Sequence, residues 1–516
     1  GSTVMPFGHA YLSPIYGQLS SGGSAKWSIN PVTPEQGLSA FTIDNAAADA
    51  MRAAGDPYAL VEAEGTAAAG EAGSLLGGDC KIYEYDPAIY DGLAENPEAT
   101  GIVFLSRSGQ EGQDQKHDAY EDGTPHYLAL SQYERGAIAA AKRICGSVAV
   151  VIVGSAPMEV ADLTSGELAV DAIVHFGHPS ERGFTRLSAL LTGEVNPSGR
   201  TVDTWSTDFT ADPSYACIGL HTYTNLPITS GSYTDGGDIL RTFNEYQEGV
   251  YMGYRYYETA ALVDPSFSYE DAVVFPFGHG LSYTTFSQTL DSVAPGEKDD
   301  ELVARVTVTN TGGVAGKDVA QLYFSAPYTE LDAELGIEKP ACGLVAFEKT
   351  EELAPGASQM LELAFTWEDM ASYSYRHENP DGSLGCYVLE AGDYVVSLRA
   401  NSHDVLAEQT LTRAETLWYD GSDAAHVRRS EREAQSRMEL DGTVTVDESA
   451  QFTAATNRFQ QSSDYMAVQS QVLTRADWAG TQPTYVEEKE IADEFAEGHD
   501  LFVTFDPETD PTYGNV

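Results

Sequence analysis

The chain has 516 residues, of which 42% are hydrophobic and 10% aromatic, as is ordinary for a folded globular protein. This length exceeds what one hydrophobic core supports and predicts about three structural units. The 79 acidic and 28 basic residues give a formal net charge of −51. Such a charge disfavours nucleic acid and anionic membranes as partners, and it favours a neutral substrate over an anionic one.

The five cysteines are isolated, odd in number and form no Cys-x-x-Cys pair. This pattern argues against a disulfide framework and against a structural zinc site. No apolar run reaches the length of about 18 residues that spans a membrane. The opening Gly-Ser resembles a cloning scar, and no signal peptide follows it. We expect a cytoplasmic protein, with a secreted or cell-surface location left open.

Residues 1–260 alternate apolar strand-like runs with helical patterns, which predicts an α/β domain with a mostly parallel sheet. Strands are expected at Thr3–Phe7, Ile102–Leu105, Val148–Val153 and Ala172–Phe176. Between them, Leu128–Arg143 has one broad apolar face, with Ser131 as a candidate N-cap and Glu134 three residues later. This segment is predicted to be the helix that connects two parallel strands.

The apolar run Ile102–Leu105 leads into a glycine-rich loop that carries Glu111 and Asp114. Open α/β sheets build their sites at the carboxyl ends of their strands. Glu111 is therefore a candidate proton donor, and the alternative is a solvated loop carboxylate. Arg107 is a candidate contact for a substrate or a partner for Asp114, and the sequence does not decide between these two roles.

Residues 300–415 change to short alternating strands separated by Gly/Pro turns, which predicts a β-sandwich of immunoglobulin or fibronectin type III shape. Strands are expected at 303–308, Val319–Phe324, Gln359–Thr366 and Tyr394–Arg399. Residues 261–299 are predicted to be a linker into this domain. Beyond residue 416 the periodicity fades, so residues 416–516 are predicted to form an irregular acidic connector. The expected role of the sandwich is to brace its neighbours.

Three long motifs, in the same order along the chain, resemble those of glycoside hydrolase family 3, β-glucosidase type. They are Gly193-Glu-Val-Asn-Pro-Ser-Gly-Arg-Thr-Val-Asp-Thr-Trp205, Tyr246-Gln-Glu-Gly-Val-Tyr-Met-Gly-Tyr-Arg-Tyr-Tyr-Glu258 and Phe275-Pro-Phe-Gly-His-Gly-Leu-Ser-Tyr-Thr-Thr-Phe286. The resemblance covers about residues 3–415 and implies an α/β sandwich domain followed by a fibronectin type III-like domain. The tail is similar to the connector of the domain-permuted subgroup, in which these domains precede the catalytic barrel.

The resemblance implies retaining hydrolysis of a neutral β-glycoside by two carboxylates, without a metal or organic cofactor. Gln110-Glu-Gly-Gln-Asp-Gln115 is similar to the family's Glu-Gly-x-Asp-Arg run, which implies that Glu111 is the general acid/base and Asp114 its supporting neighbour. The match departs at Gln115, where the family usually has arginine. The resemblance places the nucleophilic aspartate on a barrel domain of about 250 residues, for which this sequence has no room. Asp477, in Arg475-Ala-Asp-Trp478, is only superficially similar to the nucleophile motif.

Three interpretations of the whole chain follow. The first is the sandwich and fibronectin-like part of a retaining β-glycosidase, whose barrel is supplied in cis. The second is one subunit of a split enzyme, with the barrel in trans. The third is a non-catalytic carbohydrate-binding or structural derivative of the family.

Other polar and aromatic groups have competing interpretations. Asp118, Glu121, Asp122 and His126 either line an aglycone site or form a solvated insertion, which is favoured. His175 and His178 form His-x-x-His, but no acid or cysteine is spaced to complete a metal site, so core or loop histidines are expected. Tyr251, Tyr254, Tyr256 and Tyr257 lie near a domain boundary, where an interdomain core is favoured over stacking on sugar rings.

Overall fold

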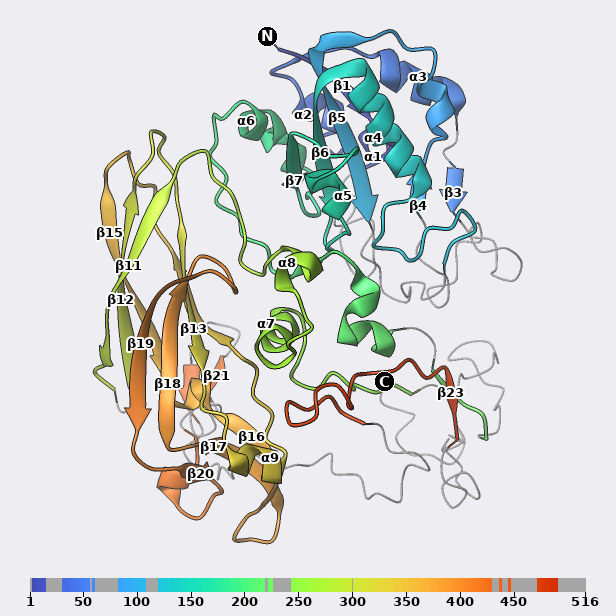
Figure 1. Cartoon of the computed structure of the whole chain (residues 1–516). Helices are drawn as coiled ribbons and strands as arrows, with labels where there is room; N and C mark the ends of the chain where they lie inside the picture. The colour runs from blue at the N-terminus through green and yellow to red at the C-terminus, as the bar shows by residue number, and fades with distance from the viewer. Residues whose placement is uncertain are drawn as a thin grey trace, which may run out of the picture.

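The computed structural model describes residues 2–14, 30–55, 58–60, 82–107, 119–218, 221–225, 243–298, 300–428, 436–438, 444–446 and 471–490. Within these ranges, an α/β domain is followed by a short helical region and then by a β-sandwich (Figure 1). None of the described helices is both long enough and apolar enough to cross a membrane.

The α/β domain is built on a five-stranded sheet in the order β2-β1-β5-β6-β7. All four strand pairs are parallel, as the sequence predicts. The strands are β1 (Thr3–Phe7), β2 (Thr42–Ile43), β5 (Asn96–Arg107), β6 (Cys145–Gly154) and β7 (Ala172–His175). The central strands β5 and β6 are buried along unbroken apolar runs, because helices cover both faces of a parallel sheet.

Most of the described helices of this domain are short. They are α1 (His9–Leu12), α2 (Pro34–Gly37), α3 (Ala46–Ala54), α4 (Gln132–Ile144), α5 (Ala161–Thr164) and α6 (Leu187–Leu191). The predicted capping box opens α4: the Ser131 hydroxyl accepts from the Glu134 N–H at 3.2 Å, and the Glu134 carboxylate accepts from the Ser131 N–H at 2.9 Å. A small hairpin joins β3 (Tyr58–Leu60) to β4 (Ile82–Glu84).

A helical region lies between the two domains. It contains α7 (Tyr254–Val263) and α8 (Tyr269–Ala272), and β10 (Val273–Phe275) pairs with β8 (Trp205–Ser206). Tyr251, Tyr256 and Tyr257 are buried in its apolar cluster, while the ring of Tyr254 packs 4.7 Å from that of Phe277. The favoured prediction of an interdomain core for these tyrosines is therefore confirmed.

The second domain is an antiparallel β-sandwich with sheets β11-β12-β15 and β14-β13-β18-β19, as the sequence predicts. Its strands are β11 (Phe286–Pro295), β12 (Glu301–Asn310), β13 (Val319–Ser325), β14 (Gly343–Lys349), β15 (Ser358–Thr366), β18 (Gly392–Arg399) and β19 (Val405–Arg413). A smaller sheet holds β16 (Ser372–Glu378), β17 (Leu384–Leu389) and β20 (Leu417–Tyr419), and helix α9 spans Glu330–Leu335. The inward alternation of β12 is as predicted, since Ala304, Val306 and Val308 are all fully buried.

The structure differs from the predicted domain boundaries in one place within residues 261–299. The predicted linker contains β11, which pairs with β12 along its whole length, so the sandwich begins at Phe286 and not at residue 300. The sequence conceals this strand because β11 is a sheet edge, and Val293 is the one buried residue among its ten.

Part of the predicted connector is also packed. The β-sandwich domain extends past the predicted end at residue 415, because β20 pairs with β17 and Tyr419 is buried in the sandwich core. Leu473 is fully buried and Trp478 is 7% exposed, both against the apolar cluster beside α7. The Trp478 ring stacks on Tyr256 at 5.3 Å, and β23 (Glu488–Lys489) pairs in parallel with β9 (Thr222–Tyr223). Residues 471–490 therefore return to the region between the domains. Two further short strands, β21 (Ser436–Met438) and β22 (Val444–Val446), form a hairpin.

Candidate active site at the carboxyl edge of the parallel sheet

The segment that carries the predicted acid/base leaves the sheet at the carboxyl end of its middle strand, β5. Glu111 and Asp114 lie outside the described residues, as does Asp118. The last described residue before them is Arg107, and the chain is described again from Ala119. The described part of the candidate site therefore consists of the side chains that hold both flanks of residues 108–118.

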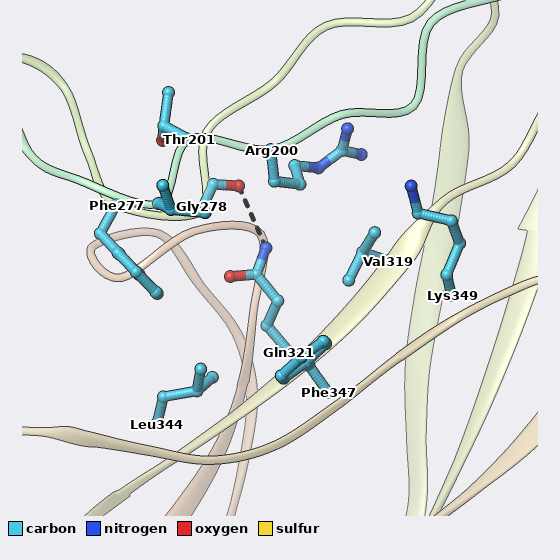
Figure 2. Close-up of a pocket in the computed structure, with 10 residues that line it drawn as sticks. Arg200, Thr201, Phe277, Gly278, Val319, Gln321, Leu344, Phe347 and Lys349 are labelled. Carbon is cyan, nitrogen blue, oxygen red and sulfur yellow. Dashed lines mark hydrogen bonds between the residues drawn. The ribbon is translucent and has the colours of Figure 1, made fainter. Parts of the chain in front are cut away.

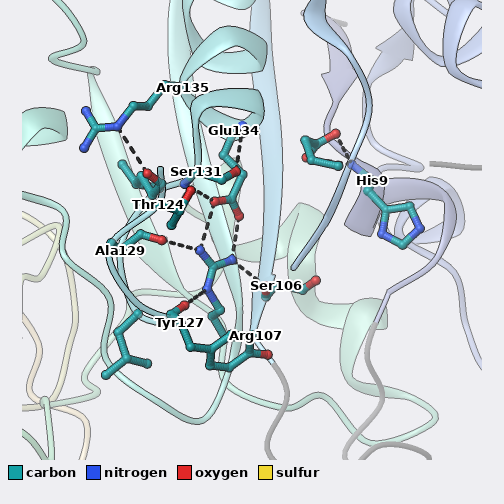
Figure 3. A network of polar contacts seen from close by, with 12 residues as sticks. His9, Ser106, Arg107, Thr124, Tyr127, Ala129, Ser131, Glu134 and Arg135 are labelled. Carbon is teal, nitrogen blue, oxygen red and sulfur yellow. Dashed lines mark hydrogen bonds and ion pairs between the residues drawn. The ribbon is translucent and has the colours of Figure 1, made fainter. Parts of the chain in front are cut away.

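Arg107 is the largest fully buried side chain in the described part of the protein. Its Nε donates to the Tyr127 carbonyl at 2.5 Å, and its Nη2 donates to the Ala129 carbonyl at 2.7 Å. The guanidinium also forms a two-pronged ion pair with Glu134, at 2.6 and 2.9 Å, and Nη1 donates to the Ser106 carbonyl at 2.9 Å (Figure 3). All five N–H donors are thereby used within the protein.

These partners differ from both predicted roles of Arg107, because no N–H donor is left for a sugar hydroxyl or for Asp114. The sequence alone does not reveal them, since the carbonyls belong to a segment that returns to the strand end 20 residues later. Burial by itself lowers the pKa of Arg107, but the charge of Glu134 and its hydrogen bonds raise it above the usual value. Arg107 therefore keeps its positive charge in this buried position.

The return flank is fixed as well. The Tyr120 ring is buried in a small apolar cluster with Ile82 and Tyr127, and the Tyr120 N–H donates to the Thr124 carbonyl at 2.8 Å. Because Arg107 holds the Tyr127 carbonyl directly, one side chain joins the departing strand, the returning segment and the N-terminus of α4. Arg107 and the described segment from Tyr120 to Tyr127 are thus held close to this edge of the sheet.

Glu84, at the end of β4, is a second buried acid near this edge and is 2% exposed. Its carboxylate accepts hydrogen bonds from the His9 N–H, at 3.0 and 3.1 Å, and from the Tyr85 N–H at 2.9 Å. Burial raises the pKa of Glu84 to about 8, even though these backbone bonds lower it. Burial also lowers the pKa of His9 to about 4.

We did not predict Glu84 from the sequence. The available signal was its inward position in the alternating run Ile82-Tyr-Glu84, where an acid must be buried beside an isoleucine. The N–H that it holds follows Gly8, whose φ is 87°. A Cβ at Gly8 would lie 2.3 Å from the Phe104 carbonyl oxygen. Glycine is therefore required where the end of β1 passes β5.

Glu84 should make the protein less stable as the pH rises from 6.5 to 8. The folded pKa of about 8 exceeds the ordinary 4.5, so the folded state retains a proton that the unfolded chain has released, and the free energy of unfolding falls across this interval. His9 gives the opposite slope, but between about pH 4 and its ordinary pKa of 6.5. We expect Glu84→Gln to remove up to about 2 kcal/mol of the loss between pH 6.5 and 8.

The measurement is urea unfolding at three pH values across this interval. Glu98→Gln, at an exposed position of β5, is the matched control and should retain the wild-type slope. If Glu84→Gln also retains the wild-type slope, Glu84 is not protonated in the folded protein at pH 6.5.

The two histidines of the His-x-x-His motif hold strand ends. The His175 Nε2–H donates to the Gly154 carbonyl at 2.8 Å, and the His178 Nε2–H donates to the Arg107 carbonyl at 3.3 Å. The His175 ring also meets Trp205 edge-on, with centroids 5.2 Å apart. They are core and loop histidines of the expected kind, and they tie β5, β6 and the segment after β7 together.

Among the described residues, His126, Glu159 and Asp208 form the one group of three whose ligand atoms lie close enough to hold a metal ion. The His126 Nδ1 accepts from the Leu128 N–H at 3.3 Å, so its Nε2 carries the proton and donates to Glu159 at 2.8 Å. The same Glu159 oxygen accepts from the Phe209 N–H at 2.7 Å. Both nitrogens of His126 are therefore used in hydrogen bonds. The aglycone-site hypothesis places His126 and Glu121 in one lining. In the structure His126 is buried, whereas Glu121 is exposed.

Asp477 stabilises a turn. Its Oδ1 accepts from the Gly480 N–H at 3.2 Å, and a Cβ at position 480 would lie 2.5 Å from its Oδ2. The carboxylate thus closes the turn that presents Trp478 to the apolar cluster beside α7. This placement agrees with the interpretation of Asp477 as a superficial match to the nucleophile motif.

Comparison with known proteins bears on the same two domains. Residues 9–283 match the family model described as the glycosyl hydrolase family 3 C-terminal domain, and residues 318–402 match the fibronectin type III-like domain. Beta-glucosidase A of Butyrivibrio fibrisolvens is 30% identical over 354 residues, which cover 62% of this chain and 38% of that protein. A beta-glucosidase of Ruminococcus albus is 30% identical over 324 residues, covering 62% of this chain and 27% of that protein.

A solved β-glucosidase from Paenibacillus barengoltzii superposes with a TM-score of 0.58 at 25% identity, over 86% of this chain and 44% of that one. The chain thus spans less than half the length of these relatives. One family model alone matches more than half of its residues. The chain belongs to glycoside hydrolase family 3, of which it carries the C-terminal α/β domain and the fibronectin type III-like domain.

Proposed function

We propose that this chain supplies the acid/base-bearing part of a retaining β-glycosidase that hydrolyses neutral, β-glucoside-like substrates. Glu111 is the proton donor in this proposal, and Asp114 supports its loop. The nucleophilic carboxylate is carried by a family 3 barrel domain, in cis or in trans. The relatives are named β-glucosidases, and each is 30% identical to this chain over an alignment that covers 62% of it.

The observation that carries the proposal is the anchoring of the described residues on both sides of residues 108–118. Their segment begins at the carboxyl end of the middle strand, where open α/β sheets place ligands. Both of its flanks are held by the buried Arg107, which bonds to Tyr127, Ala129 and Glu134. A retaining mechanism needs its two carboxyl groups about 5–5.5 Å apart, so a loop that reaches another domain needs a rigid base.

The proposed role of Glu111 as proton donor also requires a suitable pKa. A general acid works best when its pKa lies near the working pH. A glutamate reaches that range when burial or a neighbouring carboxylate raises its pKa. Asp114, three residues from Glu111, is positioned in the sequence to supply part of that repulsion. The net charge of −51 favours a neutral glycoside over an anionic one.

Hydrolysis of 4-nitrophenyl β-glucoside tests whether this chain supplies the acid/base and a barrel domain supplies the nucleophile. The chain of residues 1–516 alone should show background rates, because it lacks the nucleophile. The same chain joined to a family 3 barrel, or mixed with one, should turn the substrate over at rates that the barrel alone does not reach. Turnover by the isolated chain would contradict the missing nucleophile. No gain upon addition of the barrel would favour the non-catalytic derivative of the family.

A further inference from the structure

A pocket of about 230 Å³ lies between residues 200–202, which follow the α/β domain, and the β-sandwich. Its walls come from three places: the loop after α6, the turn that follows β10, and strands β13 and β14. Ten residues line it: Arg200, Thr201, Val202, Phe277, Gly278, Val319, Gln321, Leu344, Phe347 and Lys349. The pocket thus forms where two of the family-like sequence motifs meet the second domain.

The surface that the pocket offers to a ligand is mostly apolar. Gln321 is the polar residue at its floor, but its amide N–H groups donate to the Gly278 and Ala400 carbonyls at 3.1 and 3.0 Å. Its amide oxygen accepts from the Tyr323 hydroxyl at 3.0 Å. The floor therefore offers a ligand no unused donor, whereas Phe277, Leu344 and Phe347 offer apolar contact. Sugar hydroxyls that face Gln321 and the apolar side chains would lose their hydrogen bonds to water without replacement.

Two cations stand at one side of this apolar space, across from Phe277 and Leu344 (Figure 2). The Arg200 guanidinium pairs with Asp318 at 2.5 Å. The Lys349 ammonium donates to the carbonyl and hydroxyl of Ser198, at 2.8 and 3.2 Å. No carboxylate of the described residues lies within ion-pair distance of Lys349, so the pair of cations has one local counter-ion between them. This is a positive spot on a protein with a net charge of −51.

Two apolar side chains that line the pocket are largely exposed to solvent. Phe347 is 68% exposed and Val202 is 72% exposed, although both border a hollow that is otherwise formed by packed residues. Strand β14 is an edge of its sheet, and edge strands are places where another molecule can bind. Burial lowers the pKa of Lys349, as do Arg200 and Lys317, while Asp318 raises it. An anion in the pocket would add a second negative partner for these cations beside Asp318.

We propose that this pocket binds a small aromatic monocarboxylate of benzoate size. The ring lies against Phe277, Leu344 and Phe347, and the carboxylate meets Lys349 and Arg200. The volume is below the range of about 300–1,000 Å³ that is typical of drug-sized ligand sites, which limits the body to a single ring or a short chain. A phosphate ion would use the cations but none of the apolar walls. The long-range repulsion by the acidic surface is screened beyond about 8 Å at physiological salt.

Titration of sodium benzoate into the full chain, followed by calorimetry and saturation-transfer NMR, tests the proposal. We expect saturable binding at one site, at least tenfold tighter than that of benzyl alcohol or of acetate. Benzyl alcohol retains the ring without the charge, and acetate retains the charge without the ring. Equal binding of benzoate and benzyl alcohol would overturn the assignment of the carboxylate, and non-saturable binding would overturn the site.

Variants locate the site. Lys349→Met and Phe347→Ala should each weaken benzoate binding at least tenfold, and both positions are exposed, so the fold should persist. Lys298→Met and Met360→Ala, at exposed positions outside the pocket, are the matched controls and should bind as the wild type does. An unchanged thermal midpoint in each variant separates lost binding from lost structure. Wild-type affinity in Lys349→Met or Phe347→Ala would contradict the proposal. Because the readout is binding, its failure leaves the glycosidase proposal untouched.

Discussion

Replacing Glu111 by glutamine should slow the completed enzyme in proportion to how much each substrate needs a proton. For phenyl β-glucoside, whose leaving group is poor, we expect kcat/KM to fall by about 10²–10⁴-fold. For 2,4-dinitrophenyl β-glucoside, whose leaving group departs as an anion, kcat/KM should change little. The difference arises because kcat/KM reports the step that forms the glycosyl-enzyme, and only a basic leaving oxygen needs help in that step.

The two substrates and a control variant make this test specific. Glu121→Gln removes an exposed carboxylate shortly after the same segment, and it should leave both rates near the wild-type values. If Glu111→Gln slows both glucosides by the same factor, or neither of them, Glu111 is not the acid. A barrel supplied in cis or in trans serves equally well, provided that wild type and variants share it.

Removing the charge of Arg107 should destabilise the α/β domain strongly, and by more than the loss of Glu84 or of any exposed charge. Arg107→Met leaves the carboxylate of Glu134 buried without its partner and removes the Arg107 donors from three backbone carbonyls, those of Ser106, Tyr127 and Ala129. Breaking a buried pair from one side typically costs about 3–5 kcal/mol. We expect a loss of this size in the free energy of unfolding, measured in urea for the α/β domain.

Two further variants separate this explanation from a general cost of substitution. Arg107→Met combined with Glu134→Gln removes the orphaned charge while the amide oxygen can still accept from the Ser131 N–H. The double variant should therefore be more stable than Arg107→Met alone. Arg52→Met removes an exposed arginine paired with Glu35 and Asp49, and its effect should stay within about 1 kcal/mol. A loss in Arg52→Met as large as that in Arg107→Met would contradict the role of burial.

Elements with strong local signals could be predicted from the sequence. The buried runs of β5 and β6 and the capping box of α4 lie where the pattern indicated, because local periodicity and capping suffice to define them. Strand β11 was missed because an edge strand needs few inward apolar residues. The packing of Leu473 and Trp478 was missed because a short apolar pair in a polar segment has no period to detect.

The candidate site could also be predicted only in part from the sequence. The sequence indicated which loop to consider, because a buried strand ending in glycines and acids is a local pattern. The partners of Arg107 depend on where the chain returns 20 residues later, and no pattern in the sequence encodes that position. The raised pKa of Glu84 likewise comes from complete burial beneath the end of β1. Tertiary packing, and not residue type, sets both properties.

The return of residues 471–490 to the cluster beside α7 has a consequence during synthesis. Tyr256 and its neighbours emerge from the ribosome about 200 residues before Trp478, which covers them. At about 5–20 residues per second, this interval lasts roughly 10–40 seconds. Throughout it, the β-sandwich can fold while an aromatic surface beside it stays open to water and to chaperones. Residues 471–490 follow both domains in the chain. The aromatic cluster between the domains is therefore covered only after both domains have been synthesised.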